Sequence, residues 1–233
     1  MANLRIFFNT KEGIMRSYTL LALGLVLAAM CGLLTPSVSV AADDKDDGKW
    51  VQLFNGKDLT GWKTHPADKA KWEVKDGILI GTGPAGHLFS ERGDYENFRY
   101  RVEAKINDHG NSGQYFRAQY GPSFPKGYEA QINSTHGDPI RTGSLYPAFN
   151  RKLSMADRKK ILIMKQLHKP DEWFTQEVIA EGNHIIIKVN GKTTVDFVDE
   201  NNTYPKGHFA IQQHDPGTVI QVRKIEVMEL PAK

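Results

Sequence analysis

Long polar side chains occupy the middle of three segments in which apolar and polar residues alternate. In residues 128–134, Tyr128, Ala130 and Ile132 share one side of a predicted strand, which leaves Glu129 and Gln131 on the other. The segments 113–120 and 207–214 have the same period of two. Their polar sides carry Tyr115, Arg117, Gln212 and His214. Carboxylate, amide, guanidinium and imidazole groups in one place suit the hydroxyl groups of a sugar, so the pattern indicates a carbohydrate site.

A solvated outer sheet face is the alternative interpretation of each segment, because antiparallel sheets often face water on one side. The coincidence of three such segments favours a site. Tyr115, Tyr120 and Tyr146 could stack on the apolar face of a pyranose, although each could equally belong to the core. Gly113 permits close approach of another group to the backbone.

Only one convincing acidic residue, Glu129, accompanies these groups. Ordinary glycosidases need two carboxyl groups, about 5 Å apart for retention and further apart for inversion. The Glu-x-Asp-x-x-Glu segment typical of sandwich glucanases does not occur in this sequence. Two further interpretations remain open. Glu129 could form a structural ion pair with Arg117, and a glutamate and His214 could hold a divalent metal ion.

Short strands that are separated by turns must position these residues. Residues 98–106 alternate strictly, and residues 184–189 and 193–198 flank Asn190-Gly191, which predicts a β-hairpin with a type I′ turn. One short helix is expected within residues 154–166, capped by Ser154. The sequence therefore predicts an all-β, antiparallel two-sheet jelly-roll sandwich with one short helical insertion.

The N-terminus has the features of a secretory signal peptide. Arg16 precedes an apolar run that is shorter than the roughly 20 residues needed to span a bilayer, and the run leads to a small-residue cleavage pattern ending at Ala42. We expect a signal peptide at 1–42, a linker at 43–49 and one domain at 50–231. Export to the periplasm or the medium follows, with no membrane span after cleavage. Met15 is an alternative start, and Cys31 lies in a poor lipoprotein context.

The composition of the mature chain limits its partners and its chemistry. Removal of 42 residues from 233 leaves 191 residues without cysteine, so no disulfide or thiol nucleophile is available. Of the 30 basic and 27 acidic residues, 27 and 26 lie after the cleavage point. A nearly neutral chain disfavours electrostatic binding to nucleic acid.

Several motifs, in the right order, resemble those of the 3-keto-disaccharide hydrolase domain family over residues 50–230. They are Leu53 to Trp62, Asn111-Ser112-Gly113 with Arg117, Gly127 to Gln131, Thr142 to Tyr146, Glu172-Trp173, Asn190-Gly191 and Ile211 to His214. The resemblance implies a concanavalin A-like jelly roll. The chain departs from the pattern at Phe174, where asparagine is usual, and in the long segment 147–170.

The resemblance implies an exported enzyme that cleaves 3-keto-glycosides or 3-keto-disaccharides, by elimination and hydration or by hydrolysis. A ketone at C3 acidifies the C2 proton, so one base and one enolate stabiliser suffice. Glu129 is the expected base, with Arg117 or His214 stabilising the ketone oxygen. The expected substrate-binding residues are Gln131, Gln212, Tyr115, Asn111 and Tyr146. No cofactor is certain from the sequence, and a divalent metal ion is possible. A noncatalytic carbohydrate-binding module and an envelope scaffold are the alternatives.

Overall fold

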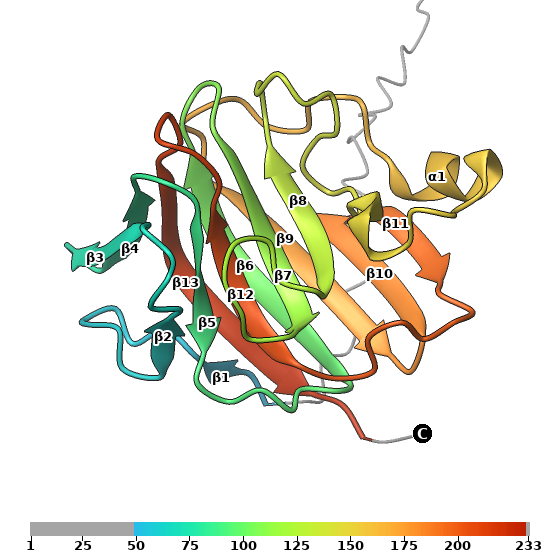
Figure 1. The fold of residues 1–233 in the computed structure, drawn as a ribbon, viewed down its shortest axis with the longest axis horizontal. Helices are drawn as coiled ribbons and strands as arrows, with labels where there is room; N and C mark the ends of the chain where they lie inside the picture. Colours follow the sequence, from blue (N-terminus) through green and yellow to red (C-terminus); the bar gives the residue numbers. More distant parts are fainter. Residues whose placement is uncertain (1–48, 232–233) are drawn as a thin grey trace, which may run out of the picture. The chain divides into compact units, whose positions relative to one another are not determined.

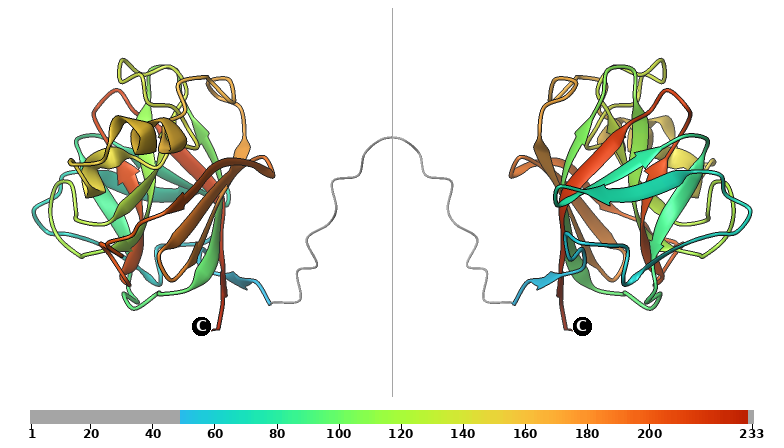
Figure 2. Two further views of the ribbon diagram at one scale, coloured as in Figure 1. Left: turned by 90° about the vertical axis from the view of Figure 1, so that its right-hand side faces the viewer. Right: turned by 90° about the vertical axis from the view of Figure 1, so that its left-hand side faces the viewer.

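Two antiparallel β-sheets pack face to face in the computed structural model, which describes residues 49–231 (Figure 1). The expected signal peptide and most of the expected linker lie outside the described residues and stay predictions. No described helix is long and apolar enough to cross a membrane. Two views from the sides show the sandwich with α1 (Met155–Ile161) facing the viewer in the left-hand one (Figure 2).

The larger sheet has eight strands and forms one layer of the sandwich. Its order is β11 (Lys192–Val198), β10 (His184–Val189), β9 (Phe174–Glu181), β6 (Phe98–Ile106), β13 (Ile220–Glu229), β4 (Ile78–Thr82) and β3 (Lys71–Lys75), with β1 (Val51–Gln52) paired to β13. The predicted hairpin is confirmed, since Asn190 and Gly191 both have positive φ angles, 49° and 76°, between β10 and β11.

The smaller sheet has five strands and carries the polar segments. Its order is β2 (Trp62–Thr64), β5 (Gly86–Ser90), β12 (His208–Gln213), β7 (Asn111–Ala118) and β8 (Tyr128–Asn133). A short 3-10 helix η1 (Pro147–Phe149) precedes α1, whose first turn is capped by the Ser154 hydroxyl accepting from the backbone N–H of Asp157 at 3.0 Å. The predicted sandwich and its helical insertion are thus confirmed.

The core between the sheets comes from the apolar side of each alternating strand. In β6, residues 98, 100, 102, 104 and 106 are all buried, and the residues between them are partly exposed. Aromatic rings join the two layers, with Phe209 of β12 stacked on Tyr100 of β6 at a centroid distance of 3.9 Å.

Strands β7 and β8 differ from β6 because every residue in them is buried. One face of β8 places Tyr128, Ala130 and Ile132 in the core, as predicted. Residues from the loops that follow β7 and β8 line a cavity over the other face, so its polar side chains are buried there instead of lying on an open surface.

Candidate functional site

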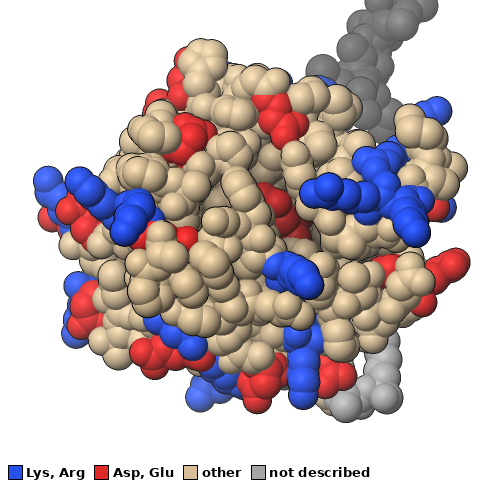
Figure 3. Space-filling model, viewed as in Figure 1, with Lys and Arg blue, Asp and Glu red and all other residues tan. Residues whose placement is uncertain are grey.

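A cavity of ≈ 440 Å³ lies on the outer face of the smaller sheet, over β7, β8 and β12. It falls in the size range typical of small-molecule sites. Figure 3 shows a hollow on this side of the molecule, with acidic side chains at its bottom and basic ones near its rim. Seven of the eight residues expected from the sequence line this one cavity: Asn111, Tyr115, Glu129, Gln131, Tyr146, Gln212 and His214.

Strand register brings these residues together. Tyr115 of β7 lies directly opposite Glu129 of β8, and the two residues further along, Gly113 and Gln131, are also partners. Strand β12 lies on the other side of β7 and contributes Gln212 near its end. Because side chains on a strand alternate, matching registers on three neighbouring strands place their polar sides on one face.

Glu129 is the central ionisable group of the cavity floor. Its residue is 8% exposed, and its carboxylate accepts a hydrogen bond from the Tyr115 hydroxyl at 2.9 Å. Gln212 Nε2 donates in turn to the Tyr115 hydroxyl oxygen at 3.2 Å. A Cβ atom at Gly113 would lie 2.4 Å from Glu129 Oε1, so glycine is what lets this carboxyl group lie flat against β7.

Burial raises the pKa of Glu129 to about 8. This value includes two smaller effects: the hydrogen bond from Tyr115 opposes the rise in pKa, and the negative charge of Asp138, which also lines the cavity, adds to it. No ion pair joins Glu129 to any cation in the described part of the chain. At neutral pH this carboxyl group is therefore mainly protonated.

Arg117 does not lie in the cavity, so its expected placement is wrong. Its φ angle is +49°, and the pairing of β7 with β12 shifts register opposite it, between His208 and Ala210. Such a bulge breaks the alternation and turns the side chain toward the other side of the sheet. The fully buried guanidinium donates to the backbone oxygens of Glu96 and Gly182, the latter at 2.7 Å.

The Glu129–Arg117 ion pair, which the sequence left open as an alternative role for Glu129, is consequently absent. Tyr120 also lies outside the cavity lining, since its ring packs against Phe89 at 5.2 Å and its hydroxyl donates to the backbone oxygen of Thr64 at 2.9 Å. The aromatic groups that do line the cavity include Phe124 and Tyr204, which the alternation of the strands could not identify because both lie in loops.

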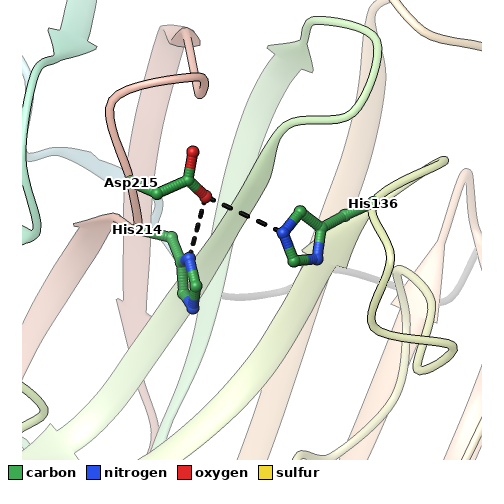
Figure 4. A group of neighbouring side chains, drawn as sticks. All are labelled: His136, His214 and Asp215. Carbon is green, nitrogen blue, oxygen red and sulfur yellow. Dashed lines mark hydrogen bonds and ion pairs between the residues drawn. The ribbon is translucent and has the colours of Figure 1, made fainter.

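Two further groups, Asp215 and His136, were not anticipated from the sequence and lie beside the expected His214 at one end of the cavity. His214 follows the end of β12, Asp215 comes next, and His136 lies in the loop after β8 (Figure 4). The carboxylate of Asp215 stands between the imidazole rings. Its Oδ2 lies 2.9 Å from His214 Nδ1 and 3.9 Å from His136 Nε2.

These three side chains could hold a metal ion by donor type, since one ligand atom from each lies within 4.8 Å of the others. Two imidazoles and a carboxylate suit Zn²⁺ and related ions. The hydrogen bonds of His136 do not fit this role. Its Nδ1 accepts from the backbone N–H of Asp138 at 3.0 Å and faces the amide nitrogen of Asn111 at 3.4 Å. An imidazole that accepts at Nδ1 carries its proton on Nε2, the atom that would have to bind the metal.

The fold and the site together define a lectin-like jelly-roll protein with a polar, carboxyl-containing cavity on one sheet. A family model described as the 3-keto-alpha-glucoside-1,2-lyase-like domain matches residues 49–228, and the chain belongs to this family. A curated relative, the 3-keto-disaccharide hydrolase of Bacteroides thetaiotaomicron, is 30% identical over 86 residues. That match covers 32% of this chain and 29% of the relative's length.

Solved structures show the same fold. Two candidate glycosyl hydrolases from Parabacteroides distasonis give TM-scores of 0.59 and 0.61 at 24% and 21% identity; the matches cover 82% and 78% of this chain and 98% and 100% of theirs. The carbohydrate-binding module CBM66 from Bacillus subtilis gives 0.51 at 13% identity, with 72% and 96% covered. The family match and the curated relative support a carbohydrate-active, glycosidase-like function.

Proposed function

We propose that this protein cleaves 3-keto-glycosides by elimination at C1 and C2, followed by addition of water. The observation that carries the proposal is the pairing, in one cavity, of a buried and protonated carboxyl group with an imidazole. Glu129 has no cationic partner and a pKa of about 8, whereas His214 donates from Nδ1 to Asp215 and so has a lone pair on Nε2. One group is ready to give a proton and the other to accept one.

The reaction uses both groups in turn. His214 Nε2 takes the C2 proton, which the neighbouring C3 ketone has acidified, and an enolate forms. The bond between C1 and the glycosidic oxygen then breaks, and Glu129 donates its proton to the departing oxygen. The products are a free alcohol and a 3-keto sugar with a double bond between C1 and C2. Glu129, now a carboxylate, next takes a proton from water as hydroxide adds to C1, and His214 returns its proton to C2.

The remaining lining groups would bind and orient the sugar. The side-chain oxygens of Asn111 and Gln212 are buried and accept no hydrogen bond from described residues, so each can accept one from a sugar hydroxyl. Leaving such acceptors unpaired costs free energy, which a bound hydroxyl group recovers. Gln131 lies on the same face of β8, and Tyr146 and Phe124 offer ring faces at the walls.

The family resemblance suggested the reverse assignment, in which Glu129 is the base. Substrates with different leaving groups distinguish the two assignments. A nitrophenolate leaves without help from an acid, whereas a sugar alkoxide needs a proton. If Glu129 is the acid, Glu129→Gln retains most cleavage of a nitrophenyl 3-keto-glucoside and loses that of a 3-keto-disaccharide. If Glu129 is the base, the variant loses both.

The proposed function itself is tested by incubating the protein with 3-keto-glucosides and with their unoxidised parents. We expect release of the aglycone from the keto substrates alone, with transient absorbance from the unsaturated ketone. Equal cleavage of the parents would indicate ordinary hydrolysis. Binding of the keto sugar without cleavage would overturn the proposal in favour of a carbohydrate-binding module.

We also propose that the protein is exported after removal of residues 1–42, because the apolar run after Arg16 ends in Val40-Ala41-Ala42. Sequencing the N-terminus of the protein from its native cell should give Asp43 as the first residue. Recovery of intact Met1 or Met15 would contradict this expectation.

A further inference from the structure

We propose that Asp215 is a positioning residue that fixes the tautomer of His214, so that Nε2 faces the cavity as a proton acceptor. Asp215 and His214 would then act as a hydrogen-bonded pair with His136 beside it, and the three side chains would not form a metal site. The inference rests on the proposed function for the role of His214 in cleavage, although its structural part can be tested without any substrate.

The turn after β12 holds the Asp215 carboxylate in place. Strand β12 ends at Gln213, so His214 and Asp215 escape the alternation that would point neighbouring side chains to opposite faces. Asp215 Oδ1 accepts from the backbone N–H of Gly217 at 2.8 Å, and Oδ2 accepts from the Thr218 hydroxyl at 3.2 Å. The backbone N–H of Thr218 closes the turn onto the Asp215 carbonyl at 3.0 Å.

This arrangement determines where the protons of both imidazoles reside. Because Asp215 Oδ2 can only accept, the neutral form of His214 carries its proton on Nδ1, and Nε2 then keeps a lone pair. No described residue donates to that Nε2. His136 has the opposite tautomer, with its Nε2–H directed toward the same carboxylate oxygen (Figure 4).

The carboxylate also assists the proposed chemistry. When Nε2 takes a proton from C2, the imidazole becomes a cation beside the Asp215 carboxylate, and the pair stabilises the charge. Asp215 itself stays ionised throughout. Other ionisable groups near His214 include His136 and the fully buried His87, whose burial lowers its pKa to about 4 and keeps it neutral. The cavity lining adds Glu129, Asp138, Lys126 and Arg151.

Asp215→Asn tests the inference because the turn dictates how asparagine must orient. The N–H of Gly217 requires an oxygen at the Oδ1 position, which leaves the asparagine NH₂ group facing His214 Nδ1. His214 must then accept at Nδ1 and carry its proton on Nε2, so it presents no acceptor to the cavity. The same exchange in a Ser-His-Asp triad lowers kcat by about 10⁴-fold for this reason.

Long-range ¹H–¹⁵N spectra of the ligand-free protein report the tautomer directly. We expect a protonated Nδ1 for His214 and a protonated Nε2 for His136 in the parent protein, and a protonated Nε2 for His214 in Asp215→Asn. Asp108→Asn is the matched control, since Asp108 accepts from Thr135 and makes no contact with His214. Signals are assigned with His214→Gln and His136→Gln.

Two results would overturn the inference: a protonated Nε2 on His214 in the parent protein, or an unchanged tautomer in a folded Asp215→Asn. Tight binding of one Zn²⁺ that moves the ring nitrogen signals of both histidines would also overturn it, in favour of a metal site. If Asp215→Asn does not fold, the parent spectrum and the zinc titration still decide the question.

Kinetic measurements then separate this inference from the proposed function. We expect Asp215→Asn to lower kcat on a 3-keto-glucoside by about 10²-fold to 10⁴-fold with little change in KM. The expected tautomers without any cleavage by the parent protein would contradict the proposed function alone. Cleavage by the parent protein with undiminished kcat in Asp215→Asn would contradict the positioning role alone.

Discussion

The outer faces of the two sheets both carry polar side chains at every second residue, but their acidic side chains have different partners. On the larger sheet, Glu177 of β9 meets Arg99 at 2.7 Å and Arg101 at 3.5 Å. Glu226 of β13 meets Arg101 at 3.4 Å and Lys224 at 2.8 Å. On the smaller sheet, Glu129 has a tyrosine hydroxyl as its partner and no cation.

This difference shows what separates a solvated strand face from a site. A charge on the larger sheet is paired with opposite charges on the same or a neighbouring strand. The carboxyl group of Glu129, buried without a counter-charge, holds its proton into the neutral range and becomes useful for proton transfer. Alternation alone cannot distinguish the two cases, because both faces follow the same period.

Replacing Glu129, the carboxyl group without a cationic partner, should have its largest effect on activity. Glu129→Gln should lower cleavage of a 3-keto-disaccharide by about 10²-fold to 10⁴-fold, because glutamine keeps the shape of the protonated acid but gives no proton. Turnover is measured by release of the free sugar, with folding checked by circular dichroism. Undiminished turnover in a folded variant would remove Glu129 from the mechanism.

A smaller effect concerns stability and its dependence on pH. The pKa of Glu129 is about 8 in the fold against an ordinary 4.5, so between these values the native state binds a proton that the unfolded state has released. Stability is then fully present below pH 4.5 and falls as pH rises to about 8. Glutamine does not titrate, so Glu129→Gln avoids this loss in the free energy of unfolding, which amounts to roughly 2–5 kcal/mol at pH 9.

The free energy of unfolding of Glu129→Gln should therefore exceed that of the parent protein at pH 9 and approach it at pH 5. Denaturant titrations at both pH values measure the difference, and other titrating groups cancel between the two proteins. A constant difference across this range would show that Glu129 is ionised in the fold at neutral pH.

On the larger sheet, a glutamate-to-glutamine change is expected to lower the free energy of unfolding instead of raising it. Glu177→Gln leaves Arg99 and Arg101 without their shared carboxylate, although Arg101 keeps Glu226 and the ring of Trp50 at 4.0 Å. We expect a loss of about 1–3 kcal/mol in the free energy of unfolding at pH 7, between the values typical of exposed and buried pairs. Turnover of the keto substrate should not change, and a large drop in kcat would mean that this face contributes to function.

Most of the fold could be predicted because its signals are local. The type I′ turn at Asn190-Gly191 requires two positive φ angles that this pair adopts easily, and the alternation in β6 needs only its own nine residues. The polar partners of β8 followed from the same period, which is why Glu129 and Gln131 were placed correctly on the cavity side.

The parts of the site that were missed depend on local exceptions or on loops. Arg117 adopts a positive φ angle although it is not glycine, and no feature of the neighbouring sequence predicts the bulge. Asp138 lines the cavity and His136 and Asp215 lie beside His214; all three come from loops, where no period tells which way a side chain points. Their meeting is a property of the folded sheet and not of any one segment.

The smallest effect is expected at the cavity wall, where Phe124 is, after Met155, the most exposed large apolar residue within residues 49–231. The residue is 60% exposed and lines the cavity, and its ring centroid lies 5.7 Å from that of His214, so a sugar bound in the cavity can contact the ring. A stacked ring contributes about 0.5–1.5 kcal/mol, so Phe124→Ala should raise KM for a keto substrate by roughly 2-fold to 12-fold and leave kcat nearly unchanged.

Little stability should be lost in Phe124→Ala, because an exposed side chain buries little apolar area. Met164→Ala, at an equally exposed apolar residue outside the cavity lining, is the control and should change neither constant. A fall in kcat without a change in KM would instead mean that Phe124 acts by packing against the imidazole of His214, so that the wall supports the proton acceptor and does not bind the sugar.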